Sequence, residues 1–344
     1  MSSSATTTRL ASDYAELRRI VRAQGLLEPQ TAYYIVKLVT VVAMLAAAAA
    51  IPFFASHPVI ILAAAVFLAF ASTQAGLLSH DIIHRQAFRG RRLNEVLRLL
   101  VGNLLLGLSH SWWALKHNAH HANPNHEDKD PDLGIPFVVF AADQIQKRPR
   151  WTHPLIAIQT VVLPTLFLVQ ALSMRGQTVH HLAVQDAPRR FLQVVLFAAH
   201  FAIYALILVA IGNWWLALGF VAVHQGLFGV YNASVFASNH KGMPLLREGE
   251  RMDFLREQVL TSRDVNGHPL TDFWYGGLNY QIEHHLFPTM PRNNLPQAQK
   301  IVREFCAERG IAYESTSLFG AYRDTWRHLH RESASARGGV GSTG

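Results

Sequence analysis

Four long apolar runs dominate the hydrophobic pattern of the chain. They cover residues 36–54, 59–78, 191–211 and 214–236. Each run is about 20 residues long, which is enough for a helix to cross roughly 30 Å of hydrocarbon at about 1.5 Å per residue. Only a few residues connect the two members of each pair. The pattern therefore predicts an all-α integral membrane protein with four transmembrane helices in two hairpins.

Positively charged residues lie at the open ends of both predicted hairpins, and neither short connection contains a lysine or arginine. Because lysine and arginine are enriched in cytoplasmic loops, we expect the open ends and both termini to face the cytoplasm. The residues that carry this argument are Arg85, Arg89, Arg91, Arg92, Arg189, Arg190, Lys241 and Arg247. The polar segments beyond these ends predict a cytoplasmic helical cap.

Two further segments have helical character. Residues 1–30 are polar to amphipathic, and they predict a cytoplasmic helix from Ser12 or Asp13 to about Gln24. Residues 93–108 are apolar but interrupted by charged and amide side chains, a mixture that is typical of an interfacial or partly embedded helix.

The apolar stretch at residues 154–172 is long enough to span a membrane. One more crossing would move the later histidine clusters to the opposite side of the membrane. We therefore interpret this stretch as re-entrant or surface-lying, and Pro164 within it supports that interpretation. The tail at residues 331–344 is rich in serine and glycine, which predicts disorder. One main domain at residues 31–330 remains.

Composition supports a membrane protein. The 344 residues are 50% hydrophobic and only 16% charged, whereas soluble domains average about 25% charged residues. The net charge of +8 comes from basic residues spread between the apolar runs rather than from one patch, so we expect no nucleic-acid partner. The single cysteine, Cys306, excludes an intrachain disulfide and a cysteine-rich metal site. The N-terminus lacks the basic-then-apolar order of a secretory signal.

Three histidine clusters carry the candidate chemistry: HDIIH at residues 80–84, HNAHH at 117–121 and QIEHH at 281–285. These clusters hold seven imidazoles, and His240 in ASNH makes a plausible eighth. Eight imidazoles are twice what a tetrahedral zinc site uses, so they suit two metals, and imidazole binds iron, copper, nickel and zinc. All three clusters fall on the predicted cytoplasmic side, which favours one shared oxygen-activating centre. The candidate ligands are His80, His84, His117, His120, His121, His240, Gln281, His284 and His285.

Histidine spacing alone is a weak signal, because the chain has 19 histidines. The segment QTVHH at residues 177–181 repeats the third pattern but lacks the following Leu-Phe-Pro, so we assign it a solvated or interfacial role. Gln281 stands where a third histidine would be expected. Its amide could bind a metal weakly, directly or through water, or it could hydrogen-bond to a ligand, and both interpretations stay open.

Two stretches make the pattern specific: GLSHSWWALKHNAHHANPN at residues 107–125 and NYQIEHHLFPTMPRNNL at 279–295. Over residues 30–325 the chain resembles the membrane fatty acid desaturases, and these stretches resemble the front-end, linoleoyl-type subgroup, in which glutamine often opens the third cluster. The resemblance implies two iron ions bound by the cluster histidines and His240, with O2 as co-substrate. It also implies that Asn232 or Asn239 holds a water molecule.

The resemblance further implies O2-dependent desaturation of a long-chain fatty acyl substrate, with no catalytic residues beyond the metal ligands. The acyl carrier is open: a membrane lipid, coenzyme A or a carrier protein. Many front-end relatives carry a fused haem domain marked by HPGG, and that motif does not occur here. An external ferredoxin-like donor and its reductase are therefore implied. Candidate docking charges are Lys116, Arg148, Arg150, Arg247 and Arg251.

Two other function classes compete with desaturation. A membrane di-iron hydroxylase acting on an alkyl, carotenoid or sterol substrate would use the same kind of centre, but with different cluster spacing. A transporter or haem-binding membrane protein would place histidines in the middle of its spans, whereas these clusters lie at span ends. The sequence leaves open the double-bond position, the chain length and the oligomeric state.

Overall fold

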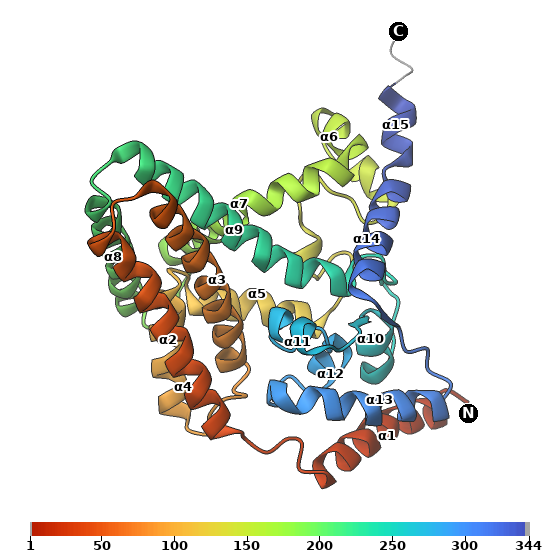
Figure 1. Ribbon diagram of the computed structural model, residues 1–344. Helices are drawn as coiled ribbons and strands as arrows, with labels where there is room; N and C mark the ends of the chain where they lie inside the picture. Colours follow the sequence, from red (N-terminus) through yellow and green to blue (C-terminus); the bar gives the residue numbers. More distant parts are fainter. Residues whose placement is uncertain (1, 341–344) are drawn as a thin grey trace. The chain divides into compact units, whose positions relative to one another are not determined.

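The computed structural model describes residues 2–340, with side chains from residue 13 to residue 338. The described chain is mostly helical (Figure 1), and its only strands are the parallel pair β1 (Asp264–Val265) and β2 (Ser315–Thr316). It divides into two compact units, each described here by itself. The span unit comprises Pro29–Lys116 and Leu166–Ser234, and the histidine unit comprises Met1–Glu28, His117–Thr165 and Val235–Gly344.

The four predicted apolar helices are confirmed. The helices that are long and apolar enough to cross a membrane are α2 (Thr31–Phe54), α3 (Pro58–Ile83), α8 (Arg190–Ala210) and α9 (Trp214–His240). In the span unit, α2 and α3 share one apolar core, to which Val41 and Ile61 contribute. Helices α2 and α3 begin before their apolar runs, α3 and α9 continue beyond theirs, and α8 matches its run to within one residue at each end. The extension carries α3 through His80.

The segment expected at residues 93–108 forms two consecutive pieces, α4 (Arg91–Leu97) and the π-helix η1 (Arg98–Leu105). Its polar side chains find partners within the span unit. Asn103 Oδ1 lies 2.9 Å from His110 Nδ1 at the start of α5 (His110–Ala122), and Asn103 Nδ2 donates to Gln193 of α8. These hydrogen bonds explain how polar residues are accommodated in an apolar segment.

The stretch at residues 154–172 falls in α6 (His153–Ala157) and α7 (Gln159–Val184), which follow one another with a bend of 96°. Such a pair is either a broken span or a re-entrant element. In the span unit, Gly229 of α9 lies so close to α7 that an added Cβ would overlap Phe167 O. Arg175 of α7 is buried and donates to Gln225 of α9. The part of α7 after residue 165 therefore packs against α9, and the re-entrant or surface-lying interpretation stays a prediction.

The histidine unit has its own apolar core. Leu17 of α1 (Ser2–Ala23) packs with residues of α10 (Phe254–Leu260), α12 (Gln281–Leu286) and α13 (Leu295–Glu308). Tyr14 adds a hydrogen bond to Leu286 O of 2.8 Å. The N-terminal helix starts earlier than expected but ends at Ala23, before Gly25, whose φ is +70°. The other helices of this unit are α11 (Pro269–Tyr275), α14 (Leu318–Glu332), η2 (Pro131–Leu133), η3 (Ala142–Lys147), η4 (Arg150–Thr152) and η5 (Arg292–Asn294).

The disordered tail expected from residue 331 is corrected for residues 334–340, which form α15 (Ala334–Val340). Ala336 is buried against Val139, Ile145 and Ile156, so tertiary packing stabilises a segment whose composition is weakly helical. Arg337 also donates to Ser333 Oγ and to His330 O. Residues 341–344 lie outside the described part of the chain.

Candidate metal centre

Three of the predicted ligands project from one helix. His117, His120 and His121 stand at i, i+3 and i+4 on α5, and this spacing puts His117 and His121 on one face, with their ring centroids 4.5 Å apart. His284 and His285 are neighbours on α12, and His240 is the last residue of α9. All six rings belong to the histidine unit, although their helices are far apart in the sequence.

These rings form two groups. The first imidazole group is His120, His240 and His285, whose ligand atoms all lie within 4.8 Å of one another. His120 Nε2 lies 3.2 Å from His240 Nε2. The second imidazole group is His117, His121 and His284, in which His121 Nε2 lies 3.1 Å from Nε2 of each of the other two rings. The rings of His121 and His285 stack at 4.2 Å, so the two groups are adjacent.

Each ring of the first imidazole group is held at Nδ1 by an oxygen atom. His120 Nδ1 lies 3.0 Å from both carboxylate oxygens of Asp130. His240 Nδ1 lies 3.1 Å from the Thr261 carbonyl, and His285 Nδ1 lies 2.9 Å from Gln258 Oε1. Metal-bound histidines commonly have this arrangement, in which the remote nitrogen donates to a carboxylate or carbonyl and thereby fixes the ring.

The hydrogen-bond acceptors also determine where the protons are. A backbone carbonyl can only accept, so His240 must carry its hydrogen on Nδ1. Burial alone would raise the pKa of Asp130, but the hydrogen bond from His120, together with the charge of Lys241, lowers this pKa below its ordinary value. Asp130 is therefore an ionised acceptor. Neutral rings protonated at Nδ1 present lone pairs at Nε2, and three such lone pairs converging on one point fit a metal ion.

His80 and His84 belong to the span unit. They lie at the end of α3, where their ring centroids are 4.7 Å apart, and both are buried. His80 Nδ1 lies 3.3 Å from Asp81 Oδ1 of the same helix. The expected i, i+4 pairing of these two rings is therefore present, and one of them has a carboxylate beside its Nδ1.

Gln281 lies beside the first imidazole group. Its Nε2 is 2.9 Å from His240 Nε2, and its Oε1 accepts a 2.9 Å hydrogen bond from Asn239 Nδ2. The orientation of Asn239 is fixed in turn, because its Nδ2 also donates to Leu278 O. The amide oxygen of Gln281 thus faces Asn239 rather than the imidazoles. Asn232, the other amide implied by the resemblance, lies in the span unit, where its Nδ2 contacts Met174.

Buried carboxyl groups hold the helix that carries His284 and His285. Asp264 of β1 accepts from Ile282 N at the start of α12, and the Tyr313 hydroxyl lies within hydrogen-bond distance of both Asp264 and Glu283. Burial, followed by the negative charge of Asp264, raises the pKa of Glu283 well above its ordinary value. Glu283, the residue before His284, contacts Tyr313 through Oε1 at 3.0 Å.

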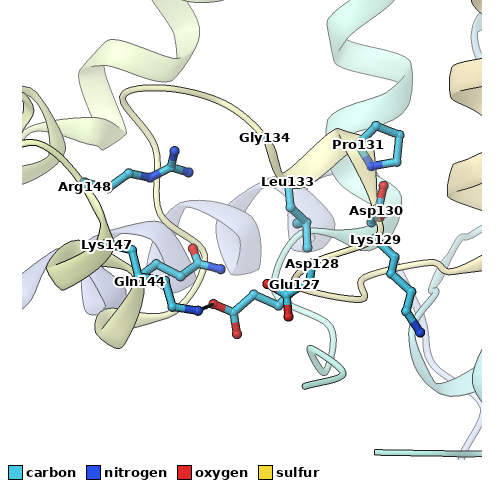
Figure 2. A pocket seen from close by; sticks show the side chains of 10 residues that line it. All are labelled: Glu127, Asp128, Lys129, Asp130, Pro131, Leu133, Gly134, Gln144, Lys147 and Arg148. Atoms are coloured by element: carbon cyan, nitrogen blue, oxygen red, sulfur yellow. Dashed lines mark hydrogen bonds and ion pairs between the residues drawn. The ribbon is translucent and has the colours of Figure 1, made fainter. Parts of the chain in front are cut away.

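An open pocket of about 500 Å³ lies behind Asp130 (Figure 2). All of its lining residues come from the segment at 127–148, which follows α5, and Lys147 forms an ion pair of 3.1 Å with Glu127 in its wall. Arg148 also lines the pocket. Asp130 thus lines the pocket and also contacts His120. Its side chain lies between this open pocket and the first imidazole group.

Comparison with known proteins identifies the family. The sequence profile of the fatty acid desaturase family matches residues 56–317, which is more than half of the chain. The chain belongs to the fatty acid desaturase family. It is 33% identical to an acyl-lipid (9-3)-desaturase of Physcomitrium patens over 325 residues, which are 91% of this chain and 61% of the moss protein.

Other relatives extend the same comparison. A Delta(6)-fatty-acid desaturase, fat-3, of Caenorhabditis elegans is 29% identical over 328 residues, 91% of this chain and 73% of the worm protein. Fatty acid desaturase 3 of Bos taurus is 30% identical over 333 residues, 94% of this chain and 73% of the bovine protein. The chain thus spans less than two thirds of the moss desaturase and about three quarters of the other two.

In this member of the family, the sequence predicted the imidazoles but only part of what orients them. Asp81 and Asp130 lie close to a cluster in the sequence, and the structure places each beside a histidine Nδ1. Gln258 and the Thr261 carbonyl were missed. A backbone carbonyl leaves no trace in a sequence, and Gln258 is an ordinary polar residue on α10.

Proposed function

We propose that the protein catalyses O2-dependent desaturation of a long-chain fatty acyl substrate at a histidine-ligated di-iron centre. The observation that carries the proposal is the first imidazole group: three Nε2 lone pairs converge, and an oxygen acceptor holds each ring at Nδ1. Membership of the desaturase family supports both the reaction and the metal. The relatives named above are acyl-lipid and fatty acid desaturases.

The proposed ligand set combines all three clusters. The first imidazole group would hold one iron, and the second imidazole group would hold the other together with His80 and His84, which we assign on sequence order and family resemblance. Bound iron would supply the activation of O2 and the removal of hydrogen from two neighbouring methylenes. The chain's own residues orient the ligands, with Asp130, Thr261 and Gln258 fixing the rings. Gln281 lies beside His240 and is not a ligand in this scheme, because its amide oxygen accepts from Asn239.

The reaction needs electrons from outside. Conversion of a CH2–CH2 unit and O2 into a CH=CH unit and two waters consumes two electrons and two protons. We propose an external ferredoxin-like donor, served by its own reductase, that docks at the pocket of Figure 2. Arg148 is the candidate docking charge that lines this pocket, where acidic and basic side chains are equally numerous, and Asp130 links the pocket to His120.

We propose the topology predicted from charge. The four spans form two hairpins, and both termini and the metal ligands face the cytoplasm. This proposal is supported by the excess of arginine and lysine at the open ends of the hairpins. The membrane lipid then surrounds the spans, whose exposed side chains include Val39, Phe191 and Leu206.

The test is expression in a host with a defined lipid profile, followed by mapping of new double bonds in extracted lipids. We expect the wild-type protein to produce them and His120→Ala to lose both product and iron, because the ring carries one Nε2 lone pair of the first imidazole group. His180→Ala is the matched control, since this exposed histidine lies in the look-alike segment QTVHH. Hydroxylated lipids instead of new double bonds, or an active His120→Ala variant, would overturn the proposal.

A further inference from the structure

Asn125 has an unusual backbone conformation next to the candidate metal centre. It lies in the loop after α5, it is 1% exposed, and its φ is +54°. Among non-glycine residues, asparagine is one of the few that adopt this left-handed conformation at low cost. The conformation turns the chain so that both the side chain and the backbone of Asn125 face inward.

The side-chain amide of Asn125 holds the residues around His240. Its Nδ2 lies 2.9 Å from His240 O, 3.3 Å from Pro244 O and 3.3 Å from Thr261 O. The carbonyl of His240 is at the end of α9, where helix carbonyls lack a partner within the helix. Thr261 O is the same atom that accepts the hydrogen bond from His240 Nδ1. One amide therefore fixes both the backbone of His240 and the acceptor that orients its ring.

The backbone of Asn125 holds the partner of His120. Its N–H donates to Asp130 Oδ2 at 2.9 Å, and Asp130 accepts the hydrogen bond from His120 Nδ1. Its carbonyl accepts from Leu246 N at 3.0 Å, in the loop that follows α9. Asn125 thus connects the supports of two imidazoles that are 120 positions apart in the sequence.

We infer that Asn125 is a positioning residue that keeps His120 and His240 in register for a single metal ion. The inference rests on the proposed function, because it needs the first imidazole group to bind metal. None of the hydrogen bonds described for Asn125 involves the second imidazole group. Loss of the amide should therefore weaken one of the two metal positions and leave the other in place.

Two variants and one control test this inference. Asn125→Gly accepts the positive φ but has no amide, and Asn125→Ala lacks the amide and also disfavours that φ. Asn123→Ala is the matched control, because Asn123 lies in the same loop and its side chain donates to Ala119 O of the preceding helix α5, at 3.3 Å, rather than to the residues around His240. The readouts are metal content per chain and the visible absorption of the cobalt-substituted protein, which reports ligand geometry without any turnover.

We expect the wild-type protein and Asn123→Ala to bind two metal ions per chain. Asn125→Gly should bind one ion tightly, with the affinity for the other reduced about 10–100-fold, as is typical when a supporting hydrogen bond of a metal ligand is lost. Its cobalt spectrum should change for one site only. Asn125→Ala should show the same loss or a greater one, and if it does not fold, the glycine variant alone decides the outcome.

Three results would overturn the inference. Asn125→Gly could keep both ions with an unchanged spectrum, it could lose both ions equally together with a large fall in unfolding temperature, or Asn123→Ala could lose as much metal as Asn125→Gly. Failure of the proposed function would look different: a wild-type protein that binds two ions but makes no double bonds refutes desaturation, while the variants still decide the role of Asn125. A wild-type protein that binds no metal refutes both.

Discussion

The histidines of the first imidazole group depend on the hydrogen-bond acceptor at Nδ1, because this acceptor decides which ring nitrogen can bind a metal. Neutral imidazole has one N–H and one lone pair, and the acceptor decides which nitrogen faces the centre. His240 illustrates the point, because the Thr261 carbonyl forces the hydrogen onto Nδ1 and leaves Nε2 as a ligand atom. The hydrogen bond between Asp130 and His120 acts in the same way, with the added attraction of an ionised carboxylate.

Gln281 provides a prediction at this scale. Since its amide oxygen faces Asn239, we expect Gln281→Ala to retain both metal ions and to lose only about 1–2 kcal/mol of unfolding free energy through the lost hydrogen bonds. His240→Ala, the comparison variant, should lose one ion. Metal content per chain and chemical denaturation measure the two effects. If Gln281→Ala lost an ion as His240→Ala should, Gln281 would be a ligand.

At the scale of elements, close backbone contact between α7 and α9 makes α7 part of the span unit. Gly229 of α9 leaves no room for a Cβ beside Phe167 O, and Ala171 N would lie 3.3 Å from that Cβ. Small residues allow such approaches between helices in membranes, where dispersion and hydrogen bonds replace the hydrophobic effect. The hydrogen bond from Arg175 to Gln225 adds a polar contact between the same two helices.

Substitution of this glycine tests the contact. Gly229→Ala should destabilise the protein by about 1–3 kcal/mol, because the added methyl group forces α7 away from α9. Gly176→Ala in α7 is the control: a Cβ there meets nothing within 4 Å, so the better helix propensity of alanine should stabilise by about 0.5–1 kcal/mol. Thermal unfolding in detergent gives both values. Equal effects of the two substitutions would show that α7 does not pack closely on α9.

Helix α13 contributes a prediction through the single cysteine. Burial raises the pKa of Cys306 to about 12, and the nearby Glu283 adds to the shift. Because the thiolate is the reactive form, we expect no modification of the folded, detergent-solubilised protein by a maleimide at pH 7 and complete modification after denaturation. Mass spectrometry of the intact chain counts the adducts. Rapid labelling of the folded protein would mean that the core around α13 opens readily.

At the scale of the whole molecule, the open question is the number of membrane crossings. Four helices qualify as spans, and the bent pair of α6 and α7 would make five if it crosses. If the chain crosses the membrane an even number of times before α8, the short α2–α3 and α8–α9 connections lie on the same side of the membrane. The side on which the second connection lies therefore decides whether α6 and α7 cross the membrane.

Cysteine labelling in intact cells answers this question. We expect Ser56→Cys and Asn213→Cys to react with a membrane-impermeant maleimide from outside, and Gln146→Cys to react only after permeabilisation. The native Cys306 should stay silent, because it is buried. Labelling of Ser56→Cys but not of Asn213→Cys in intact cells would show a fifth crossing. The proposed two-hairpin arrangement would then be wrong.

Features that depend on local pattern follow from the order of the amino acids alone. Apolar runs of span length predict the four helices, since a membrane requires a continuous apolar stretch, and the i, i+3, i+4 spacing predicts the shared helix of His117, His120 and His121. The order and spacing of the three histidine clusters were enough to predict the family. The expected ligand set, the domain boundaries and the orientation stay predictions, because they depend on the placement of the two units and on bound metal.

Only the tertiary structure decided how the rings are oriented and which weak segments are ordered. The Thr261 carbonyl, Gln258 and Asn125 act on histidines far away in the sequence, and a backbone carbonyl has no sequence signal at all. The tail helix α15 forms because Ala336 packs against residues near position 150, a contact that local composition does not contain. Periodicity reports which face of a helix is apolar, whereas hydrogen-bond partners between distant segments exist only once the chain has folded.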